Sequence, residues 1–176
     1  LELKKKGKNI MTSSEGRLSE PALRLIGGLC EHADSLTAFG NTVSSSYLRL
    51  VPGQEAPTCI CWSDLNRNAL IRVPLAWSKL LNLSKIVNPD EKIEARDSES
   101  RKTVELRTPD GSALIHLLLA GIVMAVEWGL REDRSLDLEK KFYAKSDVFT
   151  DKKLLKAFRL LPASCVESSR ILINKR

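Results

Sequence analysis

Aromatic side chains are scarce in this sequence and make up 5% of its 176 residues. The helical segments must therefore pack mainly on Leu, Ile, Val and Ala. The scarcity also weighs against a nucleic-acid-binding surface, which needs aromatics interleaved with basic residues or a helix with a basic face. The net charge of +6, from 28 Lys and Arg against 22 Asp and Glu, is a mild excess that suits a solvated basic surface.

Histidine and cysteine are also few, and their spacing completes no zinc site. Cys59 and Cys61 lie two residues apart, which places both on one face of a strand. Two such thiols could hold a soft metal, but no second cysteine pair or histidine pair accompanies them. Buried strand cysteines are therefore the favoured interpretation. No secretory signal precedes the chain, so we expect a reduced, cytoplasmic compartment.

A nearly unbroken apolar run from Ser112 to Leu130 approaches the length of a membrane span. It contains His116 and Glu127, and it follows a turn-like Pro-Asp-Gly sequence at 109–111. We therefore predict a buried helix here and no membrane-spanning segment.

The length fits one domain of ordinary size, with helices and strands in mixed order. Ser19 and Pro21 indicate the start of a helix that ends near Asp34, followed by an apolar connector at 36–40. The charge-rich stretch 77–101 is expected to be an insertion. The other expected elements are strands at 58–62, 68–75 and 102–107, an irregular segment at 136–150, and helices at 151–160 and from 163 onward.

Charged residues stand in apolar or turn-rich surroundings in several of these segments. An arginine in an apolar strand is costly unless it pairs with an acid or binds an anion, and guanidinium groups hold both oxygens of a carboxylate or phosphate. Several arginines with two glutamates suit phosphoryl transfer to a carboxylate, in which the arginines offset phosphate charge and a glutamate holds a divalent metal. The residues are Arg49, Glu55, Arg67, Arg72, Glu105 and Arg107.

A purely structural interpretation of the same residues is also open. Arg72 can form a salt bridge with Glu105 or Asp64, and Glu55 can be a solvated loop residue. Charge pairs in sheets are common, and the residues on their own favour this interpretation.

Three sequence blocks change that balance: NTVSSSYLRLVPGQEAP at 41–57, WSDLNRNALIRVPL at 62–75 and VELRTPDGSA at 104–113. They resemble the catalytic domain of glutamine synthetase. In that family an N-S-Y-x-R-L-V-P-G-x-E-A-P loop precedes an N-R-x-A-x-I-R-[IV]-P strand and an E-x-R-x-P-D strand end. The resemblance spans roughly residues 18–128, and several blocks in order are more specific than one short motif.

The resemblance implies an ATP-dependent ligase that phosphorylates the side-chain carboxylate of glutamate and lets ammonia displace the phosphate, giving glutamine. It implies that Glu55 is the flap glutamate that closes the site and takes a proton from ammonium. Arg67 is implied to contact the transferring phosphoryl group and the substrate. The other implied contacts are Arg49 and Arg107 to glutamate or its acyl phosphate, Arg72 to ATP phosphates, and Glu105 to Mg²⁺ or Mn²⁺.

The family also implies an α+β fold, with a curved, mostly antiparallel sheet that carries the site and is backed by helices, and a homo-oligomer. The sequence shows no counterpart of the family's amino-terminal domain, nor of the strands and the histidine that supply most metal ligands. We therefore expect residues 1–176 to be an incomplete, C-terminal part of such a catalytic domain, truncated at both ends and inactive alone. Two alternatives stay open: a ligase that joins glutamate to another amine, and a non-catalytic assembly module.

Overall fold

A computed structural model describes residues 1–52, 54–64, 66–74, 87–90, 92, 102–146 and 152–175. It contains helices and short strands, so the expected α+β class is confirmed. The predicted insertion at 77–101 lies almost wholly outside the described residues. The helices are α1 (Glu20–Gly40), α2 (Ser46–Arg49), α4 (Ile115–Arg131), α5 (Arg134–Lys141), α6 (Lys152–Ala157) and α7 (Cys165–Asn174).

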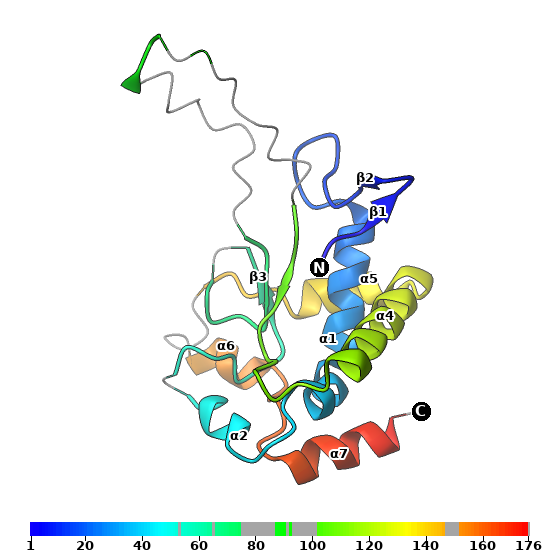
Figure 1. Cartoon of the computed structure of the whole chain (residues 1–176), viewed down its shortest axis with the longest axis vertical. Helices are drawn as coiled ribbons and strands as arrows, with labels where there is room; N and C mark the ends of the chain where they lie inside the picture. Colours follow the sequence, from blue (N-terminus) through cyan, green and yellow to red (C-terminus); the bar gives the residue numbers. More distant parts are fainter. Residues whose placement is uncertain are drawn as a thin grey trace.

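Helix α1 is the central helix of the molecule (Figure 1). It begins where the sequence predicts, because the Ser19 hydroxyl caps it and accepts the Ala22 N–H at 3.3 Å. It continues to Gly40 rather than ending near Asp34, so the predicted connector at 36–40 is wrong. Leu36 in this last part is 4% exposed, and tertiary burial carries the helix past the point where the apolar spacing weakens.

Glycines allow α1 to approach α4 closely. A Cβ atom on Gly28 would lie 2.2 Å from the carbonyl oxygen of Ala125, and one on Gly129 would lie 2.2 Å from the carbonyl oxygen of Arg24. Real Cβ atoms essentially never come within 3.0 Å of such atoms. The two backbones therefore touch at these positions, and a larger residue would force them apart.

Helix α5 also packs on α1, and it contradicts the expected irregular segment 136–150 over residues 136–141, whereas residues 142–146 belong to no helix or strand. A Cβ atom on Gly27 would lie 2.0 Å from the Ser135 carbonyl oxygen, so this contact is also backbone to backbone. The buried positions of α5 are Ser135 and Glu139, one turn apart. Because both are polar, the sequence carries no apolar periodicity from which this helix could be predicted.

The strands are shorter than predicted. A hairpin joins β1 (Lys4–Lys5) to β2 (Lys8–Asn9), and a second sheet has the order β3 (Trp62–Ser63), β4 (Ile71–Arg72) and β5 (Glu105–Leu106). Strand β3 pairs with β4 in parallel, and β4 pairs with β5 antiparallel. The described strands of this sheet are thus not mostly antiparallel, and its curvature stays a prediction.

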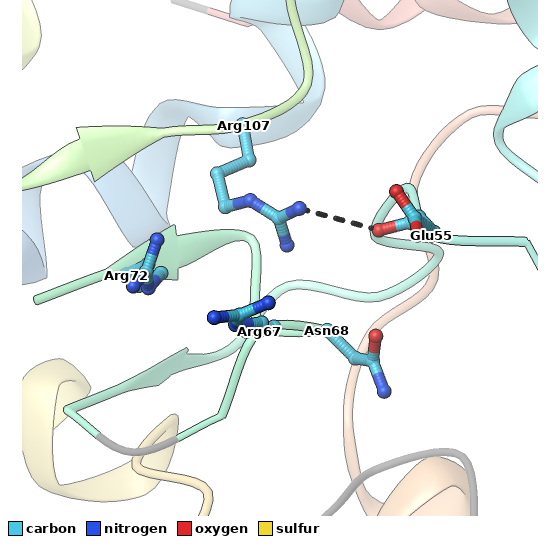
Figure 2. A pocket seen from close by; sticks show the side chains of 5 residues that line it. All are labelled: Glu55, Arg67, Asn68, Arg72 and Arg107. Atoms are coloured by element: carbon cyan, nitrogen blue, oxygen red, sulfur yellow. Dashed lines mark hydrogen bonds between the residues drawn. The ribbon is translucent and has the colours of Figure 1, made fainter. Parts of the chain in front are cut away.

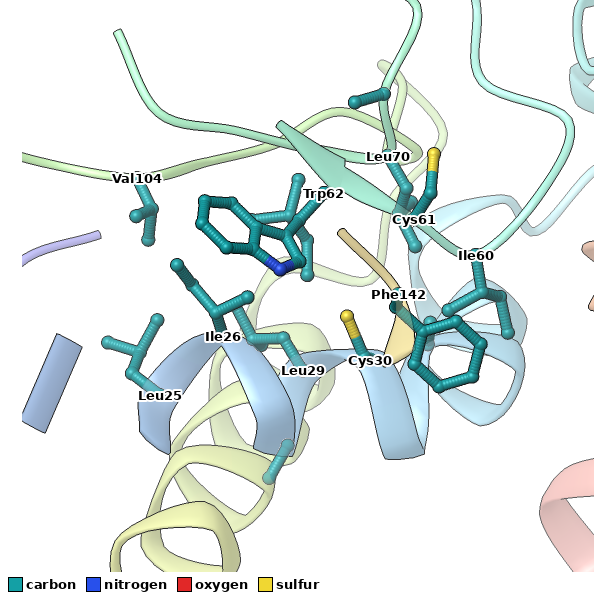
Figure 3. Close-up of a cluster of buried hydrophobic side chains, with 14 of the residues drawn as sticks. Leu25, Ile26, Leu29, Cys30, Ile60, Cys61, Trp62, Leu70, Val104 and Phe142 are labelled. Carbon is teal, nitrogen blue, oxygen red and sulfur yellow. The ribbon is translucent and has the colours of Figure 1, made fainter. Parts of the chain in front are cut away.

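The main core lies between α1 and this sheet (Figure 3). Ile26 and Leu29 on α1 are fully buried, as is Ile71 on β4. Trp62 is 5% exposed, and its indole N–H donates to the Glu139 carbonyl at 2.8 Å, which ties β3 to α5. The core is mostly aliphatic, as the scarcity of aromatics predicts.

The predicted helix is present as α4, but it is buried on one face only. Leu118, Ile122, Ala125 and Gly129 face the core at helical spacing. The opposite face leaves several large apolar side chains 50–69% exposed, among them Met124. None of the described helices is long and apolar enough to cross a membrane.

Candidate functional site

A pocket of about 290 Å³ lies beside β4 and β5. Its lining includes four of the six residues singled out from the sequence, together with one that was not. Figure 2 shows that they come from three segments of the chain: the loop that carries Glu55, the turn and strand at 66–72, and the end of β5. The lining residues are Glu55, Arg67, Asn68, Arg72 and Arg107.

Arg72 reaches the pocket from β4, where it stands opposite Glu105 of β5 in the ladder. Its Nη1 atom lies 3.1 Å from Glu105 Oε2, so the salt bridge of the structural interpretation is present. The two side chains are 32% and 44% exposed, and pairs of this kind contribute roughly 0–1 kcal/mol to stability. The ion pair alone is therefore a weak reason for an arginine at this position.

Arg107 follows β5 directly, and its backbone N–H donates to the Leu70 carbonyl at 3.0 Å. Its Nη2 donates to the Glu55 carbonyl at 3.4 Å, whereas its Nη1 is buried with no hydrogen-bond partner among the described residues. Burial and the nearby Arg72 guanidinium lower the pKa of Arg107. The protein thus leaves part of this cation unsatisfied beside the pocket, where an anion would stabilise it.

A side-chain-stabilised turn presents Arg67 and Asn68. The Asn66 carboxamide oxygen accepts the Asn68 N–H at 2.8 Å, and the Ser63 hydroxyl accepts the Asn66 N–H at 3.2 Å. Arg67 is exposed on this turn. Asn68 was not predicted as a site residue, because the family pattern allows any residue at this position. Its place next to Arg67 is the only feature of the sequence that points to it.

Glu55 is exposed, and it is the only acid among the residues that line the described pocket. Its backbone carbonyl accepts from Arg107, so the loop that carries it is tied to the end of β5. A carboxylate facing guanidinium groups across a pocket can attract a cationic substrate group while the guanidiniums hold an anionic one.

Arg49 does not line this pocket. Its Nη2 donates to the Thr108 carbonyl, and its Nε is buried without a partner in the described part of the chain. Thr108 is the residue after Arg107, and the Asn41 carboxamide also donates to its carbonyl, at 2.9 Å. Arg49 therefore lies against the backbone that leads out of the site.

Asp110 lies at the junction between the 41–46 segment and the start of α4, and its hydrogen bonds strengthen that junction. Burial raises its pKa, but hydrogen bonds from Ser112, Ser46 and Asn41 outweigh burial and lower the pKa to about 2. Asp110 Oδ1 accepts from the Ser112 hydroxyl at 2.6 Å. The carboxylate thus stays ionised and holds the backbone on which Arg49 and Arg107 depend.

The charges of the pocket suit an anion. Arg67, Arg72 and Arg107 face one carboxylate, Glu55, and guanidinium groups bind phosphate and carboxylate oxygens in pairs. A cation site is not built to the same degree: the part of the chain that the structure describes holds no group of three or more His, Cys, Asp or Glu that could bind a metal. Glu105 is the predicted metal ligand, and Arg72 occupies one of its oxygens.

Together, the fold and the pocket define an α+β domain with an arginine-lined pocket. The chain belongs to the glutamine synthetase family, since residues 1–175 match the family model described as "Glutamine synthetase, catalytic domain". The resemblance drawn from the three sequence blocks is thereby confirmed.

Curated relatives agree with this assignment. The chain is 42% identical over 125 residues to a glutamine synthetase of Pyrococcus abyssi, covering 71% of this chain and 24% of that protein. It is 36% identical over 170 residues to one of Pyrococcus woesei, covering 96% of this chain and 33% of that protein. The chain therefore spans about a quarter to a third of the length of these relatives.

Solved structures show the same fold. A cryo-EM structure of Plasmodium falciparum glutamine synthetase matches 99% of this chain and 37% of its own, with a TM-score of 0.64 and 24% identity. A chain described as "GmaS/ADP complex-Conformation 1" matches 96% of this chain and 34% of its own, with a TM-score of 0.65 and 24% identity.

Proposed function

We propose that this chain supplies the site arginines and the flap glutamate of an enzyme that makes glutamine from glutamate, ammonia and ATP. The observation that carries the proposal is the convergence of Arg67, Arg72 and Arg107 with Glu55 on one pocket. In this reaction the glutamate side-chain carboxylate takes the terminal phosphoryl group of ATP and gives γ-glutamyl phosphate. Ammonia then displaces the phosphate, and each step develops charge that fixed guanidinium groups can stabilise.

The arginines have distinct parts in this proposal. Arg72 on β4 would bind ATP phosphates, and Arg67 on its exposed turn would contact the phosphoryl group in transfer. Arg107 would bind the substrate carboxylate or the acyl phosphate, and its buried, unpartnered Nη1 is the atom that best fits an anionic ligand. Arg49 is proposed to bind glutamate, from its place against Thr108 at the edge of the site.

Glu55 is proposed to attract ammonium and take one of its protons, which leaves neutral ammonia as the nucleophile. Its exposure in a loop fits a group that closes over the substrate. The described residues alone do not build a site for Mg²⁺ or Mn²⁺, so we derive no step through a metal. Glu105 stays the proposed ligand, and completing such a site requires donors from outside the described residues.

The remaining assignments are also proposals. We propose that residues 1–176 are the incomplete, C-terminal part of the catalytic domain, that the whole protein is a cytoplasmic homo-oligomer, and that this chain alone is inactive. The family match and the partial coverage of the relatives support them. The alternatives are a ligase that joins glutamate to another amine and a non-catalytic assembly module.

The test is phosphate release by the whole natural protein with ATP, magnesium and glutamate, with and without ammonium. We expect release to require ammonium and to fall at least tenfold in Glu55→Ala, while the control Glu132→Ala, at an exposed residue between α4 and α5, keeps its rate. In Arg107→Gln we expect the affinity for glutamate to fall roughly 10- to 150-fold, as for loss of a charge-assisted hydrogen bond. Release driven by another amine would favour the alternative ligase, and no release with any amine would favour the non-catalytic assembly module.

A further inference from the structure

Cys59 and Cys61 form a close thiol pair that the proposed reaction does not use. Their sulfur atoms lie 3.8 Å apart, and the Cys59 thiol donates to the Cys61 sulfur. The residues are 1% and 0% exposed, so the pair lies within the main core. Cys30 is also buried in this core, and Figure 3 shows it on α1, below the segment that carries Cys61.

The backbone holds the two thiols in this arrangement. The Ile60 N–H between them donates to the Arg159 carbonyl at 2.7 Å, and the Cys61 carbonyl accepts the Ile71 N–H at 3.1 Å. Cys59 forms an isolated antiparallel bridge with Leu160. Because the segment is fixed on both sides, the alternating side chains at its two ends point to the same face and their sulfurs stay adjacent.

The two sulfurs differ in character. The hydrogen bond from Cys59 lowers the pKa of Cys61 in opposition to burial, and a hydrogen bond from the Leu70 backbone acts in the same direction. The same hydrogen bond and burial raise the pKa of Cys59. Cys61 is therefore the better nucleophile, and Cys59 is the neighbouring thiol that can react with it.

We propose that Cys59 and Cys61 are a reversible modification site at which a peroxide converts the thiol pair to a disulfide. The Cys61 thiolate attacks one peroxide oxygen and the O–O bond breaks, which leaves a sulfenic acid on Cys61 and releases hydroxide. The Cys59 sulfur then attacks the Cys61 sulfur, forms the S–S bond and expels the sulfenic oxygen. In sum, two thiols and one hydrogen peroxide give one disulfide and two water molecules.

Charge and coordination favour this product over a bound metal. A disulfide is neutral and needs no further ligand, which suits an apolar core. Two thiolates leave a tetrahedral metal short of donors, and the described residues provide no group of three or more metal-binding side chains. Because both thiols are buried, the oxidant reaches them only when the segment opens locally, so we expect slow oxidation. In a reducing compartment such a disulfide would be transient.

Trypsin makes the test direct, because both cysteines fall in one peptide, 50–67, whereas Cys30 and Cys165 fall alone in the peptides 25–49 and 160–170. The whole natural protein is treated with hydrogen peroxide, unfolded, alkylated at free thiols, digested and weighed by mass spectrometry. After oxidation we expect the 50–67 peptide to carry no alkyl group and to weigh two hydrogen atoms less than the unmodified peptide. Dithiothreitol should restore both alkyl groups. The Cys30 peptide should stay alkylated throughout.

Variants sharpen the result without being essential to it. Cys59→Ala and Cys61→Ala should each abolish the peptide form that lacks two hydrogen atoms and marks the disulfide, while Cys30→Ala should leave that form intact. The proposal is overturned if the 50–67 peptide keeps both alkyl groups under conditions that oxidise the half-buried Cys165. It is equally overturned if Cys61 is recovered cross-linked to Cys30. None of these outcomes depends on the ligase activity.

Discussion

The contact between α1 and α4 gives the sharpest quantitative prediction. In Gly129→Ala the new methyl group would lie 2.2 Å from the Arg24 carbonyl oxygen and 3.0 Å from the Cα and N atoms of Gly28. All of these are backbone atoms of a helix, so no side-chain rotation relieves the clash. Ordinary contact begins near 3.4 Å, so the helices must separate by about 3.4 − 2.2 = 1.2 Å.

Two opposing effects determine how Gly129→Ala changes the free energy of unfolding. Alanine raises helix propensity over glycine by about 1 kcal/mol. Overpacking a close contact costs roughly 1–3 kcal/mol, and more when backbone must shift. Separation also loosens the packing of Leu118 and Ile122, which α4 buries against the core. We therefore expect Gly129→Ala to lower the free energy of unfolding by about 2 kcal/mol.

Gly121→Ala is the matched control on the same helix. Its methyl group would lie 2.8 Å from Leu36 Cδ2, the far end of a flexible side chain that can turn away. The gain in helix propensity is the same, so we expect a change within about 1 kcal/mol. Urea unfolding of the whole natural protein measures both variants, and hydrogen exchange in α1 and α4 localises the loss. Equal stability of Gly129→Ala and Gly121→Ala would refute the backbone-contact reasoning.

Two further predictions concern the junctions that position these elements. The Asp110 pKa is about 2 in the folded protein, below its unfolded value of about 4, so its contribution is full above pH 4 and is lost as the pH falls towards 2. Asp110→Asn should flatten this acid limb of the melting temperature, and an unchanged limb would contradict the assignment. Ser19→Ala removes the α1 cap and should cost about 1 kcal/mol in urea unfolding, whereas the exposed Ser14→Ala should cost nothing measurable; equal losses would argue against the cap.

The site was more predictable than the fold around it. Residues 55, 67 and 72 lie in one part of the sequence and residue 107 lies well beyond them, and spacing alone says nothing about their distance in space. The family blocks carry that long-range information, and the structure brings these four residues to one pocket. Asn68 was not predicted, because a pattern that tolerates any residue at a position cannot indicate whether that side chain points into the site.

The errors in the fold have one physical origin. The late end of α1, the whole of α5 and the parallel pairing of β3 with β4 are all decided by tertiary contacts. In α5 the buried residues are Ser135 and Glu139, so apolar periodicity gives no signal. Local propensity predicts an element reliably only where its own buried face is apolar, as in α1 and on the inner face of α4.

The purely structural interpretation accounts for one of the pocket arginines better than for another. The structural interpretation accounts for Arg72, which pairs with Glu105. It does not account for Arg107, whose Nη1 is buried without a partner among the described residues and whose pKa is lowered by burial and by Arg72. A scaffold gains nothing from a guanidinium with one unsatisfied buried nitrogen beside a second guanidinium, because the two like charges repel each other. An anionic ligand reverses the sign of both effects, so the arrangement favours a pocket built to be filled.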